Sequence, residues 1–112
     1  MMDNTENKEI IDFVKLSETE TAVLFYFSHE NCNVCKVLRP KVFDLIQTDF
    51  PKIKVYYIDV KKFPDTAAFF SVFVSPTILV FFEGKEYIRK SRNFGVEELG
   101  SAMDRIYKII FG

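Results

Sequence analysis

The two cysteines of the chain, Cys32 and Cys35, are the side chains best suited to carry out a reaction. They follow the apolar run at residues 22–27 and open a helical pattern, so the second thiol lies one turn beyond the first. Unpaired backbone N–H groups and the helix dipole favour a thiolate at a helix N-terminus, and the thiolate is the nucleophilic form of cysteine. The two thiols are also close enough to close a small disulfide ring. Their type and spacing therefore predict thiol–disulfide chemistry.

Two other interpretations of this pair stay open. His29, Cys32 and Cys35 are all metal-ligand types, but the chain has no second CxxC motif that would complete a site. A metal ion or iron–sulfur cluster shared between two chains is therefore one alternative. The other is a redox-inert pair on a non-catalytic module that binds a partner, because a fold does not determine a function.

The composition is that of one compact domain, which we expect to cover residues 1–112 with a flexible N-terminus at residues 1–6. Apolar residues make up 48% and charged residues 28% of the chain, which is the balance of a globular protein with a real core. With 13 Phe and no Trp, that core should be rich in phenylalanine. The net charge is −1 without a basic stripe, so nucleic acid is not an expected partner.

The start of the chain predicts the cellular compartment. Residues 1–7 are polar and acidic, without the basic and apolar regions of a signal peptide, and no apolar run is long enough to span a bilayer. We therefore expect a cytoplasmic protein that does not associate with membranes. Structural disulfides are rare in that compartment, which favours redox or metal chemistry for the CxxC motif.

Apolar periodicity predicts an α/β fold with a four-stranded mixed sheet and helices on both faces. The strand–helix–strand unit around the cysteines should be parallel, with a right-handed crossover. Pro40 should kink the second helix, Asp65 should cap the third, and Gly84 should form a tight turn. The predicted helices are 7–17, 33–49 (or from Cys32), 65–71 and 95–110, and the predicted strands are 22–28, 53–59, 77–83 and 86–92.

Several short motifs lie at particular distances from the cysteine pair along the chain. The helix after the first strand reads Cys32-x-x-Cys35-Lys36-x-x-x-Pro40, and Pro76-Thr77 opens the third strand. Because of these motifs and the Gly84 turn, the chain resembles the thioredoxin superfamily over residues 8–110. The resemblance implies a thioredoxin-like fold in which the bond between Ser75 and Pro76 is cis.

The resemblance also implies a thiol–disulfide oxidoreductase that reduces protein disulfides. Cys32 would be the nucleophile, and Cys35 would resolve the mixed disulfide by attacking Cys32. The main chain of Ser75 would pair with the incoming peptide. Electrons would come from an external reductase or a low-molecular-weight thiol, and no bound cofactor would be needed. The protein would be a monomer. The other residues expected to contact substrate are Asn33, Val34, Pro76 and Arg92.

The chain departs from the family pattern around the cysteines. Asn31 and the pair Asn33-Val34 stand where the family usually has Trp and Gly-Pro. Tyr26 replaces the usual buried acid, and a tyrosine with a pKa of about 10 is a poor proton acceptor at neutral pH. We therefore expect Cys35 to lose its proton to water, Glu30 or His29, with slower resolution of the mixed disulfide.

The residues after the last strand are also more polar than is usual in the family. Ser91, Arg92 and Asn93 should border the reactive sulfur, where small and apolar residues are typical. We expect Arg92 to favour partners with acidic groups. Lys36 and Asp59 are expected to be solvated charges at the ends of their elements.

Overall fold

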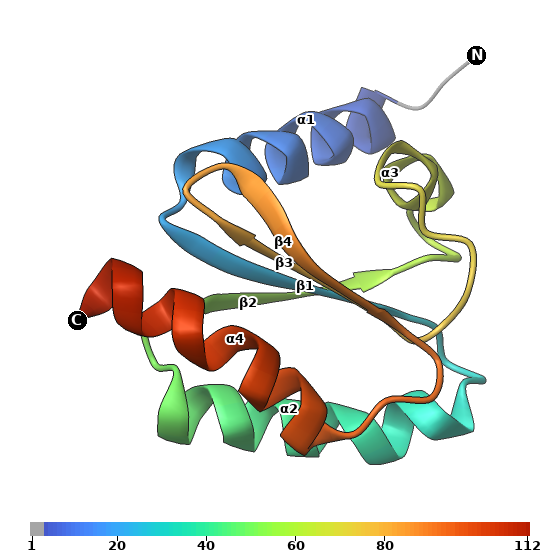
Figure 1. Ribbon diagram of the computed structural model, residues 1–112. Coiled ribbons are helices and arrows are strands. Elements are labelled where there is room, and N and C mark those ends of the chain that lie inside the picture. Colours follow the sequence, from blue (N-terminus) through green and yellow to red (C-terminus); the bar gives the residue numbers. More distant parts are fainter. Residues whose placement is uncertain (1–3) are drawn as a thin grey trace.

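A computed structural model describes residues 4–112 (Figure 1). Within this range, four helices and four strands follow one another in the order that the sequence predicts. The single sheet has the strand order β2-β1-β3-β4. The elements are α1 (Asn4–Thr19), β1 (Ala22–Ser28), α2 (Asn33–Asp49), β2 (Lys54–Asp59), α3 (Pro64–Phe69), β3 (Thr77–Phe82), β4 (Lys85–Ser91) and α4 (Val96–Phe111).

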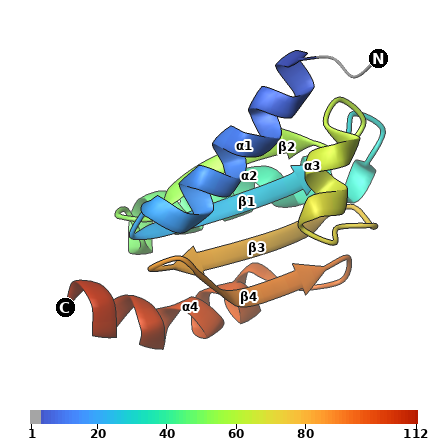
Figure 2. The same cartoon turned by 90° about the horizontal axis from the view of Figure 1, so that it is seen from above.

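The sheet is mixed, as predicted. Strand β1 runs parallel to β2 and antiparallel to β3, and β3 forms an antiparallel hairpin with β4. Helices α1 and α3 cover one face of the sheet, and α2 and α4 cover the other (Figures 1 and 2). The α/β, four-stranded class with helices on both faces is therefore confirmed.

The core has two apolar layers that meet at β1. Residues 22–27 of this strand are all buried, because the sheet is covered on both sides. Phe25 and Phe27 face α1 and α3, where Phe70 and Phe81 pack around them; the Phe25 ring centroid lies 5.4 Å from that of Phe70 and 5.7 Å from that of Phe81. The predicted phenylalanine-rich core is confirmed on this face. Alternate residues of β1, including Tyr26, face α2 and α4.

Most predicted boundaries lie within two residues of the observed ones, and two predictions need correction. Helix α1 begins at Asn4, three residues before the predicted start, so residues 4–6 belong to a helix. Residues 1–3 of the expected flexible segment lie outside the described residues. Asp65 is not the cap of α3: the cap position is Phe63 and Pro64 opens the helix, since its fixed φ and missing N–H suit the first helical position.

Two other predicted local features can be located in the structure. Gly84 has φ of 83°, and a Cβ there would lie 3.3 Å from the Glu18 carbonyl oxygen, so the turn between β3 and β4 requires glycine. Helix α2 continues past Pro40 to Asp49. The kink at Pro40 stays a prediction.

Candidate active site

The carboxyl end of β1 leads directly into the cysteine motif. The Cys32 N–H donates to the His29 carbonyl oxygen at 3.2 Å, which turns the chain from the strand into α2. Cys32 is the N-cap of the helix, with extended backbone angles of φ −87° and ψ 100°. Its Sγ accepts a hydrogen bond from the Cys35 N–H at 3.1 Å. A sulfur therefore pairs one of the N–H groups that a helix N-terminus leaves open, and a negative charge on that sulfur would strengthen the bond.

The two cysteines form a disulfide with a Cα–Cα distance of 5.2 Å. Both side chains belong to the apolar cluster beneath α2 and α4. Cys35 is 4% exposed and Cys32 is 8% exposed, so Cys35 is slightly the more buried of the two. The pair is therefore able to cycle between a dithiol and a disulfide, with Cys32 the nearer to solvent.

The other residues predicted to bind substrate lie on two segments. Asn33 and Val34 are exposed in the first turn of α2, with Val34 54% accessible. Ser75 and Pro76 are joined by a cis peptide bond, as the resemblance implies. Arg92 is exposed, and its backbone N–H donates to the Pro76 carbonyl oxygen at 2.9 Å. No hydrogen bond among residues 4–112 joins Pro76 or Arg92 to either cysteine.

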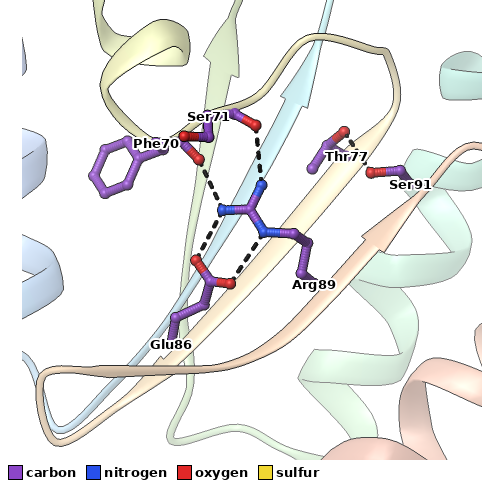
Figure 3. Close-up of polar contacts among 6 residues, drawn as sticks. All are labelled: Phe70, Ser71, Thr77, Glu86, Arg89 and Ser91. Atoms are coloured by element: carbon purple, nitrogen blue, oxygen red, sulfur yellow. Dashed lines mark hydrogen bonds and ion pairs between the residues drawn. The ribbon is translucent and has the colours of Figure 1, made fainter.

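The sheet register brings these two segments to the same edge. Thr77, which follows the cis proline, lies opposite Phe27 near the carboxyl end of β1. The Thr77 hydroxyl donates to the Val74 carbonyl oxygen at 2.8 Å. It also lies 3.1 Å from the Ser91 hydroxyl (Figure 3). The segment before Pro76 is therefore tied both to β3 and to β4.

Tyr26 occupies the position beneath the motif where the family usually has an acid. Its side chain is fully buried, and its hydroxyl donates to the Cys35 carbonyl oxygen at 3.1 Å. The pKa of Tyr26 is raised to about 12, mainly by burial and also by the neighbouring Tyr57, while Arg39 opposes the shift. The phenol thus stays protonated and holds the main chain of Cys35. It offers no base for the Cys35 thiol at neutral pH.

A cavity of about 240 Å³ reaches Cys35 from the side of β2. Its walls carry charged side chains of both signs, which come from residues 30–39 and from Asp59. The Arg39 guanidinium carbon lies 3.9 Å from the centroid of the Tyr57 ring. The residues that line the cavity with Cys35 are Ser28, His29, Glu30, Lys36, Arg39, Tyr57, Ile58 and Asp59.

The cavity changes how three charged residues are interpreted. Asp59 is the last residue of β2, as predicted. Its Oδ1 accepts hydrogen bonds from the N–H groups of Lys61 and Lys62 in the following turn, at 2.8 and 3.3 Å. Asp59 and Lys36 nevertheless share the cavity with Cys35. Arg39 was missed altogether, since its contact with Tyr57 joins a helix to a strand and leaves no local sequence signal.

His29 stands out among the cavity residues. Its Nδ1 is buried and has no hydrogen-bond partner among residues 4–112. Within that same range, no group of three or more His, Cys, Asp or Glu side chains is arranged to hold a metal ion. The three residues that the sequence offered as metal ligands therefore do not form such a group, and two of them are bonded to each other.

Comparison with known proteins identifies the arrangement. The family model described as Thioredoxin matches residues 3–105. The chain belongs to the thioredoxin family. It is 32% identical to the thioredoxin-like protein YdfQ of Bacillus subtilis over 87 residues, which are 78% of this chain and 77% of the relative. It is 34% identical to a thioredoxin of Buchnera aphidicola over 88 residues, which are 79% and 75% of the two chains.

Solved structures of thioredoxins have the same fold. Thioredoxin 1 from Thermosipho africanus superposes with a TM-score of 0.71 at 30% identity, over 78% of this chain and 96% of that one. Oxidised thioredoxin O2 from Arabidopsis thaliana superposes with a TM-score of 0.79, over 89% and 88% of the two chains. The second pair is only 20% identical and shows the fold alone.

Family membership and a disulfide-forming Cys32–Cys35 pair support thiol–disulfide oxidoreductase activity in general. The superfamily predicted from the sequence is confirmed. Across residues 4–112, none of the helices has the length and apolar character needed to cross a membrane.

Proposed function

We propose that this thioredoxin-family protein reduces disulfides of protein substrates through the Cys32–Cys35 pair. The observation that carries the proposal is the disulfide at the N-terminus of α2, with Cys32 Sγ as the helix cap. In the reduced protein, the Cys32 thiolate attacks a substrate disulfide and releases one substrate thiolate. The Cys35 thiolate then attacks Cys32 Sγ, releases the second substrate thiolate and forms the disulfide of the oxidised protein.

Cys32 suits the role of nucleophile because of its position. The Cys35 N–H points at its sulfur, and the partial positive charge of the helix N-terminus lowers the free energy of a thiolate there. Cys35 suits the resolving role because it is the more buried of the two and lies one turn into the helix. A substrate reaches it only through the mixed disulfide with Cys32.

The Cys35 thiol must lose a proton before it can attack. Tyr26 is a hydrogen-bond donor to Cys35 and keeps its own proton, so it cannot accept another. The cavity beside Cys35 is lined by Glu30 and by His29, whose Nδ1 has no hydrogen-bond partner among residues 4–112 and accepts a proton in the tautomer that carries its hydrogen on Nε2. We assign proton acceptance to His29, directly or through water in the cavity. The proton later leaves with the substrate thiol.

Substrate peptides would lie across the cis proline. The main chain of Ser75 pairs with the peptide, and Asn33, Val34 and Pro76 border it. Arg92 is exposed and hydrogen-bonded to Pro76 through its backbone, so its side chain can attract acidic groups of a substrate. An Arg92→Ala variant that keeps its rate on acidic peptides would contradict this role.

The reaction cycle is complete only when the Cys32–Cys35 disulfide has been reduced back to the dithiol. A dithiol that reduces other disulfides must be reduced again, by an external reductase or a low-molecular-weight thiol, and no bound cofactor takes part. We locate the reaction in the cytoplasm, where such reducing systems keep thiols reduced. We expect the protein to act as a monomer on protein substrates, not on nucleic acid or membranes.

Insulin-disulfide reduction with dithiothreitol as electron donor tests the proposal. The wild type should accelerate the reaction, Cys32→Ser should remove the acceleration, and Cys35→Ser should accumulate a mixed disulfide with the substrate. A wild type no faster than Cys32→Ser would overturn the proposal and favour a non-catalytic binding module.

A further inference from the structure

The segment at residues 70–76, which leads from α3 to the cis proline, is held at both ends by the edge strand β4. At the Pro76 end, the bonds are those of Thr77 with Ser91 and of Arg92 with Pro76. At the α3 end, the side chain of Arg89 reaches across from β4 to the main chain of the segment (Figure 3). No local sequence pattern distinguishes Arg89 from the other charged residues of β4.

The Arg89 guanidinium uses four of its five N–H donors. Its Nη2 donates to the Phe70 carbonyl oxygen at 2.7 Å, and its Nη1 donates to the Ser71 carbonyl oxygen at 3.1 Å. Its Nε and Nη2 also donate to the two carboxylate oxygens of Glu86, at 3.0 and 2.9 Å. The bidentate pair with Glu86 fixes the plane of the guanidinium and so aims its remaining donors at the two carbonyl groups.

These two carbonyl groups need an external partner. Phe70 is the C-cap of α3, where the last carbonyl groups of a helix have no partner within it. Ser71 has φ of 58°, a left-handed conformation that is unfavourable for a residue with a side chain and persists only when its surroundings enforce it. Arg89 meets both needs, because a cation at a helix C-terminus also suits the helix dipole. The chain therefore leaves α3 in one direction, toward Ser75.

We propose that Arg89, oriented by Glu86, is a positioning residue for the peptide-binding edge at Ser75 and Pro76. The inference rests on the proposed function, since it assigns Arg89 to the reaction with protein disulfides. Arg89 does not touch the reacting sulfurs. It fixes the direction of the 70–76 segment, so that the main chain of Ser75 meets a substrate peptide without first being ordered.

This role predicts a difference between two kinds of substrate. A disulfide-containing peptide needs the main chain of Ser75, so loosening the 70–76 segment should weaken its binding. A small aromatic disulfide has no peptide strand to pair, and its reaction needs only Cys32 and Cys35. Loss of Arg89 should therefore raise KM for the peptide and leave the reaction with the small disulfide unchanged.

The test compares Arg89→Met, Arg89→Lys and a matched control, Lys90→Met. Lys90 is the next residue of β4 and its ion pair is with Glu98 of α4, so the control also removes one surface cation. We expect KM for the peptide to rise about tenfold in Arg89→Met, with kcat and the small-disulfide rate within about twofold of wild type. Arg89→Lys should resemble Arg89→Met, because an ammonium group cannot reproduce the fork. Lys90→Met should match wild type.

A second readout does not depend on activity. Hydrogen exchange at the Ser71 and Val72 amides should accelerate in Arg89→Met and not in Lys90→Met. An unchanged peptide KM, or equal losses on both substrates, would overturn the positioning role. A wild type inactive on both substrates would refute the proposed function, and exchange at Ser71 and Val72 would then decide whether Arg89 holds the segment at all.

Discussion

The two faces of the sheet bury their side chains equally well but use them differently. On the α1 and α3 side, Phe25 and Phe27 meet other phenylalanines and supply only packing. On the α2 and α4 side, Tyr26 is buried to the same degree, yet its hydroxyl bonds to Cys35. Neighbouring residues of one strand thus have different roles: Phe25 and Phe27 stabilise the fold, and Tyr26 contacts the cysteine motif. The aromatic packing on the α1 and α3 face secures the fold, which leaves the other face free to carry an unusual residue beneath the cysteines.

The largest expected effect tests the packing face. Phe25→Ala should lower the free energy of unfolding by about 3–5 kcal/mol, because it removes a fully buried ring with five aromatic neighbours on the far side from the cysteines. Urea unfolding measures the loss. Phe73→Ala is the control: this ring is 81% exposed, so the change should be within about 0.5 kcal/mol.

The same Phe25→Ala variant should keep the reduction potential of the Cys32–Cys35 pair, measured on the folded protein by titration with glutathione. If the reduction potential changed together with the free energy of unfolding, the two faces of the sheet would not act independently.

The next effect tests Tyr26 through pH. Its pKa is raised from 10.0 to about 12, so between these values the unfolded chain loses a proton that the folded protein keeps. The protonated phenol of Tyr26 makes its full contribution to the free energy of unfolding below about pH 10. This contribution falls as pH rises toward 12, by at most about 3 kcal/mol. Unfolding free energies of wild type and Tyr26→Phe should therefore converge, or change order, as pH rises above 10. Parallel curves would show that the phenol titrates as in the unfolded chain.

The smallest of the three effects concerns the proton of Cys35. His29→Gln should slow release of the second substrate thiol by about tenfold, since general base catalysis contributes at least this much in most enzymes. The first attack by Cys32 should keep its rate. Stopped-flow kinetics with a fluorescent disulfide peptide separates the two steps. Glu30→Gln is the matched variant, and slowing in that variant alone would assign the proton to Glu30.

Local signals in the sequence account for most of the successful predictions. The buried run of β1, the start of α2 at the cysteine motif and the turn at Gly84 each depend on a few adjacent residues, whereas the cis bond at Pro76 was implied by the resemblance to the thioredoxin superfamily. The start of α1 was placed late because residues 4–6 are polar, and polar residues at a helix N-terminus carry no apolar periodicity. The cap of α3 was misjudged because Asp65 and Pro64 both fit a helix start, and proline took the first helical position.

The features that were missed all depend on partners distant in the chain. Arg89 lies 18 and 19 residues from the carbonyl groups that it binds. Arg39 and Tyr57 come from a helix and a strand that meet only after folding. A single arginine among the charged residues of β4 has no distinguishing pattern, so the family resemblance could imply the cis proline, but nothing in the sequence pointed to the side chain that directs the chain toward it.

The cap of α2 links helix stability to electron transfer. Cys32 Sγ accepts the Cys35 N–H, and the charge on that sulfur changes when the pair is reduced. The dithiol and disulfide proteins must therefore differ in their free energies of unfolding, and a thermodynamic cycle equates this difference with the shift in reduction potential between the folded and unfolded pair. About 1.4 kcal/mol corresponds to about 30 mV. Two unfolding curves, one for each redox state, would thus report how far folding tunes the pair as an electron donor.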